Sequence, residues 1–144
     1  MQLDRFTVKA QEALAAAHQL AAGRNHSQVE TEHLLVALLD QEGGLTVPIL
    51  EKIGANPAVV ESDLQNQLGR FATVAGASQL TLSQHLRNVL EKSQAESEHM
   101  KDSYVSTEHV LIALAGEGDW TSDLLRRHGV SREGILTVLK DLRG

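Results

Sequence analysis

The feature that most constrains this chain is an internal repeat. Residues 29–39 (VETEHLLVALL) recur as residues 105–115 (VSTEHVLIALA), and seven of the eleven paired residues are identical at a spacing of 76. The match continues on both sides of this motif. Such self-similarity indicates two copies of one structural unit. We therefore predict repeat one over residues 1–69 and repeat two over 81–144, joined by a surface linker over 70–80 that is rich in small and polar residues.

Each repeat is predicted to contain four helices, and we see no strand pattern of any length. The first helix of each repeat follows a cap at Thr7 or Ser83, whose hydroxyl can accept a hydrogen bond from a free backbone amide. The second helix begins after Thr31 or Thr107, and its leucines and valines form a broad apolar face.

The third helix of repeat one runs from near Thr46 to Gly54, and its counterpart runs from Ser122 to Gly129. The fourth helix opens at Asn56-Pro57 and closes at Gly69; its counterpart covers residues 131–143. A repeat of about 70 residues would be only marginally stable alone. The predicted fold is therefore all-α, with two pseudo-twofold-related four-helix repeats, about eight helices in all, forming one domain over residues 1–144.

Composition and charge exclude several classes of protein. The chain has no cysteine, which excludes disulfides and thiolate chemistry. No Gly-Lys pair occurs, so a phosphate-binding P-loop is absent and we expect no cofactor in this chain. The net charge is −6 and the basic residues are dispersed, which argues against a nucleic-acid partner. The polar N-terminus and the lack of a long apolar run predict a cytoplasmic protein with no membrane partner.

Histidines, serines and carboxylates are the residues of this chain that could form a metal site or a catalytic site. His33 and His109 lack a second histidine at helical spacing, so a structural role is favoured over a metal site. The serines stand at predicted helix caps and not in a nucleophile motif. Glu32 and Glu108 stand in the first turn of a helix, where a carboxylate is favoured by the helix dipole. We predict no catalytic residue and no metal site, and hence no enzyme activity of this chain by itself.

The two copies of the Thr-Glu-His motif, with the opening residues 4–7 (DRFT) and the segment 102–108 (DSYVSTE), resemble the Clp N-terminal repeat domain of the Hsp100 unfoldases. The resemblance covers essentially the whole chain and is closest to the ClpB branch. It implies a non-catalytic domain of a protein disaggregase, linked to two AAA+ ATPase rings that use ATP and Mg²⁺ as a hexamer. The isolated domain is expected to be a monomer. The expected partners are unfolded or aggregated client proteins.

The resemblance also implies a client-binding groove with an apolar floor and a polar rim. Carried over to this sequence, the matching positions are Thr7, Val8, Leu90, Asp102 and Glu108. Lys92 and His109 stand near this groove, where apolar side chains are expected. The pattern of residues alone leaves Val8 and Leu90 equally compatible with a place in the core.

Two alternatives stay open. In the ClpC branch, paired glutamates recognise phosphorylated arginine, and Glu32 and Glu108 match those positions. The chain would then be a tag-recognition module of a protease-coupled unfoldase. Docking of an adaptor protein is the other alternative, at a surface that the sequence does not locate.

Overall fold

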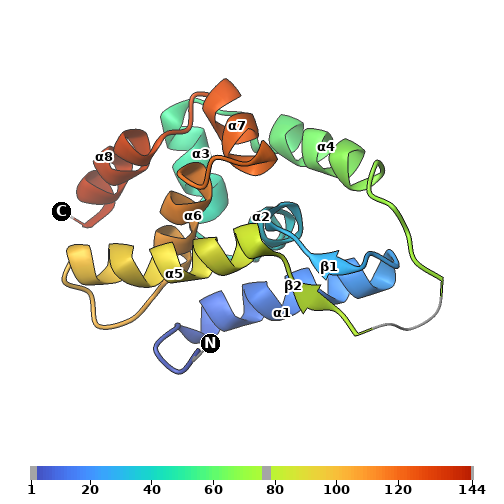
Figure 1. Cartoon of the computed structure of the whole chain (residues 1–144). Coiled ribbons are helices and arrows are strands. Elements are labelled where there is room, and N and C mark those ends of the chain that lie inside the picture. Colours follow the sequence, from blue (N-terminus) through green and yellow to red (C-terminus); the bar gives the residue numbers. More distant parts are fainter. Residues whose placement is uncertain (1–2, 76–78, 144) are drawn as a thin grey trace.

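The structure, a computed structural model, describes residues 3–75 and 79–143 (Figure 1). Residues 76–78 of the predicted linker, like residues 1–2 and 144, lie outside the described part. Eight helices occur within it, and the predicted helical class is confirmed. They are α1 (Val8–Gly23), α2 (Thr31–Leu39), α3 (Thr46–Ile53), α4 (Pro57–Leu68), α5 (Gln84–His99), α6 (Thr107–Ala115), α7 (Trp120–Arg127) and α8 (Arg132–Arg143).

Residues that favour caps set several helix ends, as expected. The Thr7 hydroxyl oxygen accepts a hydrogen bond from the Ala10 amide at 3.1 Å, and the Ser83 hydroxyl oxygen accepts one from the Leu86 amide at 3.1 Å. Gly54 ends α3 with φ at 104°, a backbone conformation that side chains with a Cβ rarely adopt. These ends depend on neighbouring residues only, which is why the sequence predicts them.

Three helices begin earlier than predicted. Thr31 and Thr107 are the first residues of α2 and α6 and not the residues before them. Ser122 is not the cap of α7, because the helix begins at Trp120 and Asp119 caps it. The Asp119 carboxylate accepts from the Ser122 amide at 3.1 Å, and the Ser122 hydroxyl oxygen accepts from the Asp119 amide at 2.8 Å. A carboxylate cap is also favoured by the helix dipole, which explains why α7 begins after Asp119 and not after Ser122.

The prediction that no strand exists was wrong. Two strands of two residues each, β1 (Gln28–Val29) and β2 (Thr81–Leu82), pair in parallel, with Val29 opposite Leu82. A separate parallel bridge joins Phe6 to Val105. Two residues are too few to show an alternating pattern, so sequence periodicity does not detect them.

The bridge between Phe6 and Val105 is the pseudo-symmetric counterpart of the β1–β2 pair. Phe6 corresponds to Leu82, and Val29 corresponds to Val105, both at the repeat spacing of 76. Each repeat therefore pairs the segment before its first helix with the segment before the other repeat's second helix. The backbone pairing of either repeat is completed only by the other.

Helices α2 and α6 lie in the middle of the fold, surrounded by the other helices (Figure 1). All nine residues of α2 are buried, which explains why this segment is apolar on nearly every face. One cluster of buried apolar residues extends from Phe6 to Leu139 and includes residues of both repeats. Helix α8 of repeat two packs against α3 of repeat one as well as against α6.

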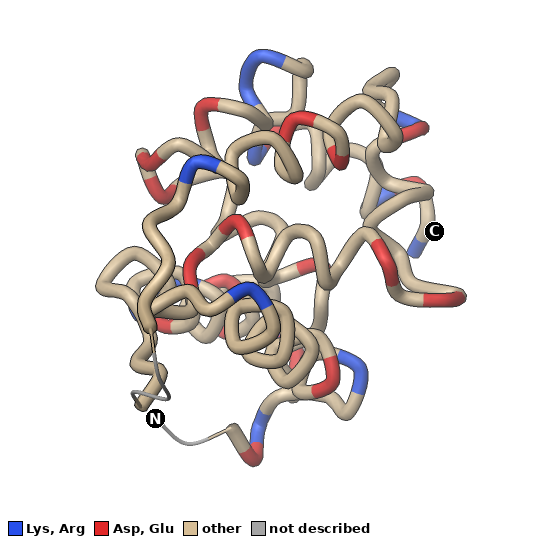
Figure 2. Tube along the Cα trace, turned by 90° about the vertical axis from the view of Figure 1, so that its right-hand side faces the viewer, with Lys and Arg blue, Asp and Glu red and all other residues tan. Residues whose placement is uncertain are grey.

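Charged residues are spread along the chain trace and do not collect on one element (Figure 2). No helix in the described ranges is both long enough and apolar enough to cross a bilayer.

Candidate functional site

The segment before α6 lies against the segment before α1. The Thr7 amide donates to the Val105 carbonyl at 2.9 Å, and the Val105 amide donates to the Arg5 carbonyl at 2.8 Å. The Arg5 guanidinium donates to the Ser103 carbonyl at 3.0 Å. This parallel pairing brings two residues of the predicted groove, at positions 7 and 8, beside the segment that carries two others, at 102 and 108.

Two large apolar side chains are strongly exposed at this junction. Val8 is 72% exposed and Tyr104 is 61% exposed. Exposed apolar groups beside polar ones are typical of surfaces that bind other proteins. We call the surface made by Thr7, Val8, Asp102, Tyr104 and Glu108 the inter-repeat surface. Sequence reasoning missed Tyr104, because its exposure follows from the pairing of residues far apart in the chain.

Leu90 is not part of this surface. It is 2% exposed and belongs to the buried cluster. Lys92 is exposed, but its ammonium binds the Glu117 carboxylate at 2.7 Å, in the loop between α6 and α7. His109 is buried, with 1% exposure. Of the predicted groove residues, the structure thus brings together four and leaves Leu90 in the core.

Arg143 joins the two carboxylates of the inter-repeat surface. Its guanidinium lies 3.1 Å from Asp102 Oδ2 and 3.1 Å from Glu108 Oε2. Partial burial alone would raise the pKa of Asp102, yet hydrogen bonds from Arg143 and His109 lower it overall. The pKa of Glu108 is also lowered, because bonds from Ser106, its own backbone and Arg143 outweigh burial. The pair is an anionic site whose geometry already accepts a guanidinium.

His109 holds Asp102 in place. Its Nδ1 accepts from the Ser106 amide at 2.9 Å, and its Nε2 lies 2.7 Å from Asp102 Oδ2. Because Nδ1 accepts a backbone hydrogen, the ring carries its proton on Nε2 and donates it to the carboxylate. His109 therefore acts as a positioning residue for the carboxylate.

Repeat one contains the same arrangement with a different partner. His33 Nδ1 accepts from the Glu30 amide at 2.8 Å, and its Nε2 lies 2.8 Å from His26 Nδ1. His26 corresponds to Asp102 at the repeat spacing of 76. Burial, together with His26 and Arg24, lowers the pKa of His33 to about 4, so the ring is neutral at pH 7. In the described ranges, no three His, Asp or Glu side chains are arranged to hold a metal ion.

The two glutamates of the repeated motif have different neighbours. Glu32 is buried, and its carboxylate lies 3.4 Å from the Gln67 amide nitrogen and 3.4 Å from the Thr31 hydroxyl. Burial raises its pKa. The Glu108 side chain is 11% exposed and faces Arg143. The two glutamates of the predicted tag-binding pair therefore differ in their partners, since a guanidinium faces Glu108 and a neutral amide faces Glu32.

Comparison with known proteins identifies the family. The family model described as "Clp repeat (R) N-terminal domain" matches residues 5–128. The chain belongs to this family. Chaperone protein ClpB of Nitratidesulfovibrio vulgaris is 37% identical to it over 150 residues, which cover 100% of this chain and 17% of that protein. The chain thus spans about a sixth of the length of its ClpB relatives.

Solved structures of Clp N-terminal domains share the fold. The Hsp104 N-terminal domain from Candida albicans matches with a TM-score of 0.85 and 24% identity, covering 98% of this chain and 93% of that one. A complex of a ClpV N-domain with a VipB peptide matches with a TM-score of 0.73 and 18% identity, over 94% of this chain and 87% of that one. The predicted resemblance to the Clp N-terminal domain, with ClpB chaperones among its relatives, is confirmed.

Proposed function

We propose that the inter-repeat surface binds exposed segments of unfolded or aggregated polypeptides, as the substrate-binding domain of a ClpB-like disaggregase. The observation that carries the proposal is the exposure of Val8 and Tyr104 beside the Asp102–Glu108 pair. Apolar client side chains would pack on the first two, and basic client residues would bind the carboxylates. The peptide complex of a related ClpV N-domain supports peptide binding as a role that this fold can take.

The wider proposal follows from the family. The chain would contribute binding only, with no reaction of its own, and ATP and Mg²⁺ would be used by AAA+ rings of the same cytoplasmic protein. One small surface gives weak binding, and six copies in a hexamer would raise the overall affinity by avidity.

Replacing Val8 with serine is expected to weaken client binding about fivefold, since an exposed apolar contact of roughly 1 kcal/mol is removed. The probe is reduced, carbamidomethylated α-lactalbumin, which cannot refold. Its affinity is measured by titration, with amide NMR shifts to locate the contact. Val59→Ser is the matched control, because Val59 is an exposed valine on α4. Equal affinities of Val8→Ser and wild type, or shifts confined to other helices, would contradict the proposal.

Replacing Arg143 with glutamine is expected to strengthen binding of peptides that contain arginine. Arg143 occupies the site that a client guanidinium would use. Removing a competitor that leaves a site open only about a fifth of the time would raise the apparent affinity about fivefold, which is the size of effect expected here. The probe is an unstructured apolar peptide with one arginine, compared with the same peptide carrying neutral citrulline. Arg126→Gln removes the same charge from α7 and is the control. Unchanged affinity in Arg143→Gln would exclude competition by Arg143.

The same guanidinium site keeps a second function open, namely docking of phosphorylated arginine or of an adaptor in a ClpC-like unfoldase. The contact of Arg143 with Asp102 and Glu108 favours guanidinium recognition in repeat two. In repeat one, Glu32 faces the neutral Gln67 amide and not a guanidinium. Tighter binding of a phosphoarginine peptide than of its unmodified form would favour this second function.

A further inference from the structure

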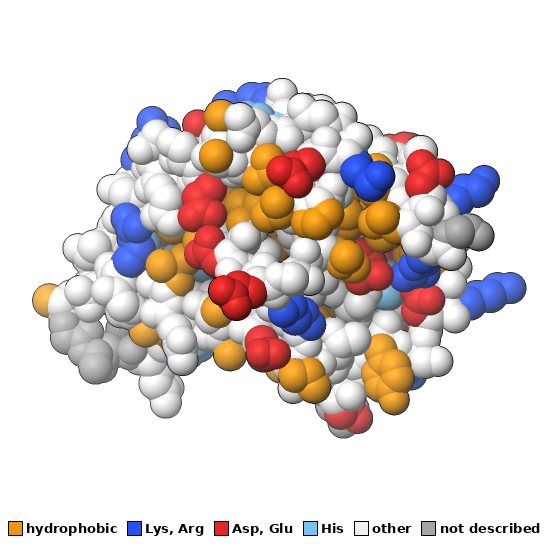
Figure 3. Space-filling model, turned by 180° about the vertical axis from the view of Figure 1, so that it is seen from behind, with side chains coloured by type: hydrophobic (Ala, Val, Ile, Leu, Met, Phe, Trp, Pro, Cys, Tyr) orange, Lys and Arg blue, Asp and Glu red, His pale blue; other side chains and the backbone are white. Residues whose placement is uncertain are grey.

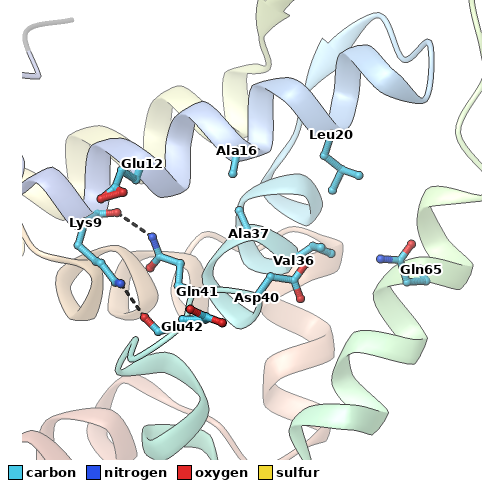
Figure 4. Close-up of a pocket in the computed structure, with 10 residues that line it drawn as sticks. All are labelled: Lys9, Glu12, Ala16, Leu20, Val36, Ala37, Asp40, Gln41, Glu42 and Gln65. Carbon is cyan, nitrogen blue, oxygen red and sulfur yellow. Dashed lines mark hydrogen bonds between the residues drawn. The ribbon is translucent and has the colours of Figure 1, made fainter.

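A groove runs along α1 of repeat one. It encloses about 510 Å³ between α1, α2 and α4 (Figure 4). Four apolar side chains form part of its lining: Ala16, Leu20, Val36 and Ala37. Its residues on α1 extend from Lys9 to Leu20, about 16 Å at 1.5 Å per residue, or three helical turns. It begins one residue beyond Val8 and leads away from the inter-repeat surface.

The equivalent positions in repeat two are bridged by ion pairs. Ala16 corresponds to Lys92 and Leu20 corresponds to Glu96, at the repeat spacing of 76. The Lys92 ammonium binds Glu117 at 2.7 Å, and Glu96 accepts three hydrogen bonds from the Arg132 guanidinium at 3.0, 3.1 and 3.1 Å. Small and apolar residues in repeat one replace these bridging side chains. At these two positions, side chains bridge repeat two, whereas repeat one leaves the groove open.

Negative charge surrounds the groove. Glu12, Asp40 and Glu42 line it, and Glu61 lies one turn before the lining residue Gln65 on α4. Burial, together with the neighbouring Asp40, raises the pKa of Glu61. Within residues 3–75 and 79–143, no ion pair joins any of these four carboxylates to a cation.

The one basic residue in the lining, Lys9, offsets only part of this charge. The Lys9 ammonium donates to the Glu42 backbone carbonyl at 2.7 Å, and the Gln41 side-chain amide donates to the Lys9 carbonyl at 2.9 Å (Figure 4). In the space-filling view of the face opposite to Figure 1, hydrophobic side chains gather with both acidic and basic side chains around them (Figure 3). An apolar floor with a rim in which three carboxylates stand against one ammonium is complementary to a ligand that is apolar on one side and basic at its edges.

We propose that this groove docks one basic amphipathic helix of a partner protein, in addition to client binding at the inter-repeat surface. Helices bind grooves through apolar side chains at positions i, i+3 or i+4, and i+7, which span about two turns and fit the length of this groove. Lysines or arginines beside those positions reach the rim carboxylates. The partner is thus separate from an unfolded client, because the groove selects a helix with a defined apolar face.

The test uses a synthetic peptide of about 14 residues with leucines at helical spacing and lysines between them, long enough for a marginal helix in water. The comparison peptide carries glutamate in place of every lysine. Binding is followed by titration and by amide NMR. We expect the lysine peptide to shift amides of α1, α2 and α4 that line the groove, and the glutamate peptide to shift none. Binding of both peptides alike would overturn the proposal.

Ala16→Arg introduces the kind of side chain that closes repeat two, and it should weaken binding of the lysine peptide about tenfold. Ala15→Arg is the matched control, since it adds the same charge at the neighbouring exposed position of α1, outside the groove lining. The control should lose less than about twofold. Equal losses of peptide affinity in the two variants would show a general charge effect and would contradict the proposal.

Val8→Ser separates this groove from the proposed client site. Peptide binding that survives Ala16→Arg but is lost in Val8→Ser would place the peptide on the inter-repeat surface and refute groove docking. Self-association of the chain that Ala16→Arg abolishes would identify a second copy as the occupant and equally refute it. The two proposals can also fail separately. If the lysine peptide binds the groove but Val8→Ser does not weaken client binding, the docking site is supported and the client site is refuted.

Discussion

Replacing Leu111 by alanine is expected to lower the free energy of unfolding by about 3 kcal/mol, within one unfolding transition. Leu111 is 0% exposed in the middle of α6. Its counterpart Leu35 on α2 is also 0% exposed, and Leu35→Ala should have a similar effect. Both leucines belong to the buried cluster that includes residues of the two repeats. The loss should therefore destabilise the whole chain and not one repeat.

The single tryptophan allows the unfolding of repeat two to be followed separately. Trp120 begins α7, so its fluorescence reports on repeat two, whereas circular dichroism reports on the helices of both. We expect Leu35→Ala in repeat one to shift the urea transition seen by Trp120 as much as the transition seen by circular dichroism. Leu142→Ala, at a half-exposed position of α8, is the control and should change stability by less than about 0.5 kcal/mol. Two separate transitions would show that the repeats fold as independent domains.

The parts of the fold that were predicted depend on neighbouring residues. Thr7 and Ser83 cap their helices, and Gly54 ends α3, because a hydroxyl or a missing Cβ acts within one turn of the chain. The eight helices follow from apolar spacing in the same way. The pairing of Phe6 with Val105 was missed, since it joins segments that are far apart in sequence.

In the candidate site too, the sequence predicts local features and misses those that depend on distant contacts. The pattern of residues did not decide between core and surface for Val8 or for Leu90, yet Val8 is 72% exposed and Leu90 is 2% exposed. Only the packing of α1 and α5 on the central helices decides between them. Glu32 and Glu108 match perfectly in the repeat, but their environments differ because Gln67 lies over one and Arg143 lies beside the other. The duplication predicts equivalent positions and not equivalent neighbours.

Acidification is expected to remove about 3 kcal/mol of stability through His33 alone. The pKa of this ring is about 4 in the folded chain, against about 6.5 in an unfolded chain. Between these values the unfolded state binds a proton and the folded state does not, so stability is lost as the pH falls from about 6.5 to about 4. The cause is geometric, because Nδ1 accepts the Glu30 amide and the ring lies buried against His26 and Phe71.

Two measurements check the histidine prediction. In the folded chain, ring NMR signals of His33 should stay those of the neutral Nε2-protonated form from pH 7 to about 5. Urea unfolding should show a weaker loss of stability with acid in His33→Gln than in wild type, even though the variant is less stable at pH 7. The comparison must be differential, because burial raises the pKa of Glu32, and its protonation stabilises the folded chain over an overlapping range of pH.

His18→Gln is the matched control, since it removes an exposed ring from α1 and should leave the dependence on pH close to that of wild type. A His33 ring that titrates near pH 6.5, or an equal acid effect in wild type and His33→Gln, would contradict the prediction. The partner of the histidine ring differs between the repeats, and this difference explains why the loss of stability with acid is assigned to His33. In repeat two the corresponding ring donates to the Asp102 carboxylate, whereas in repeat one His33 faces a second imidazole, which offers no negative charge to stabilise its protonated form.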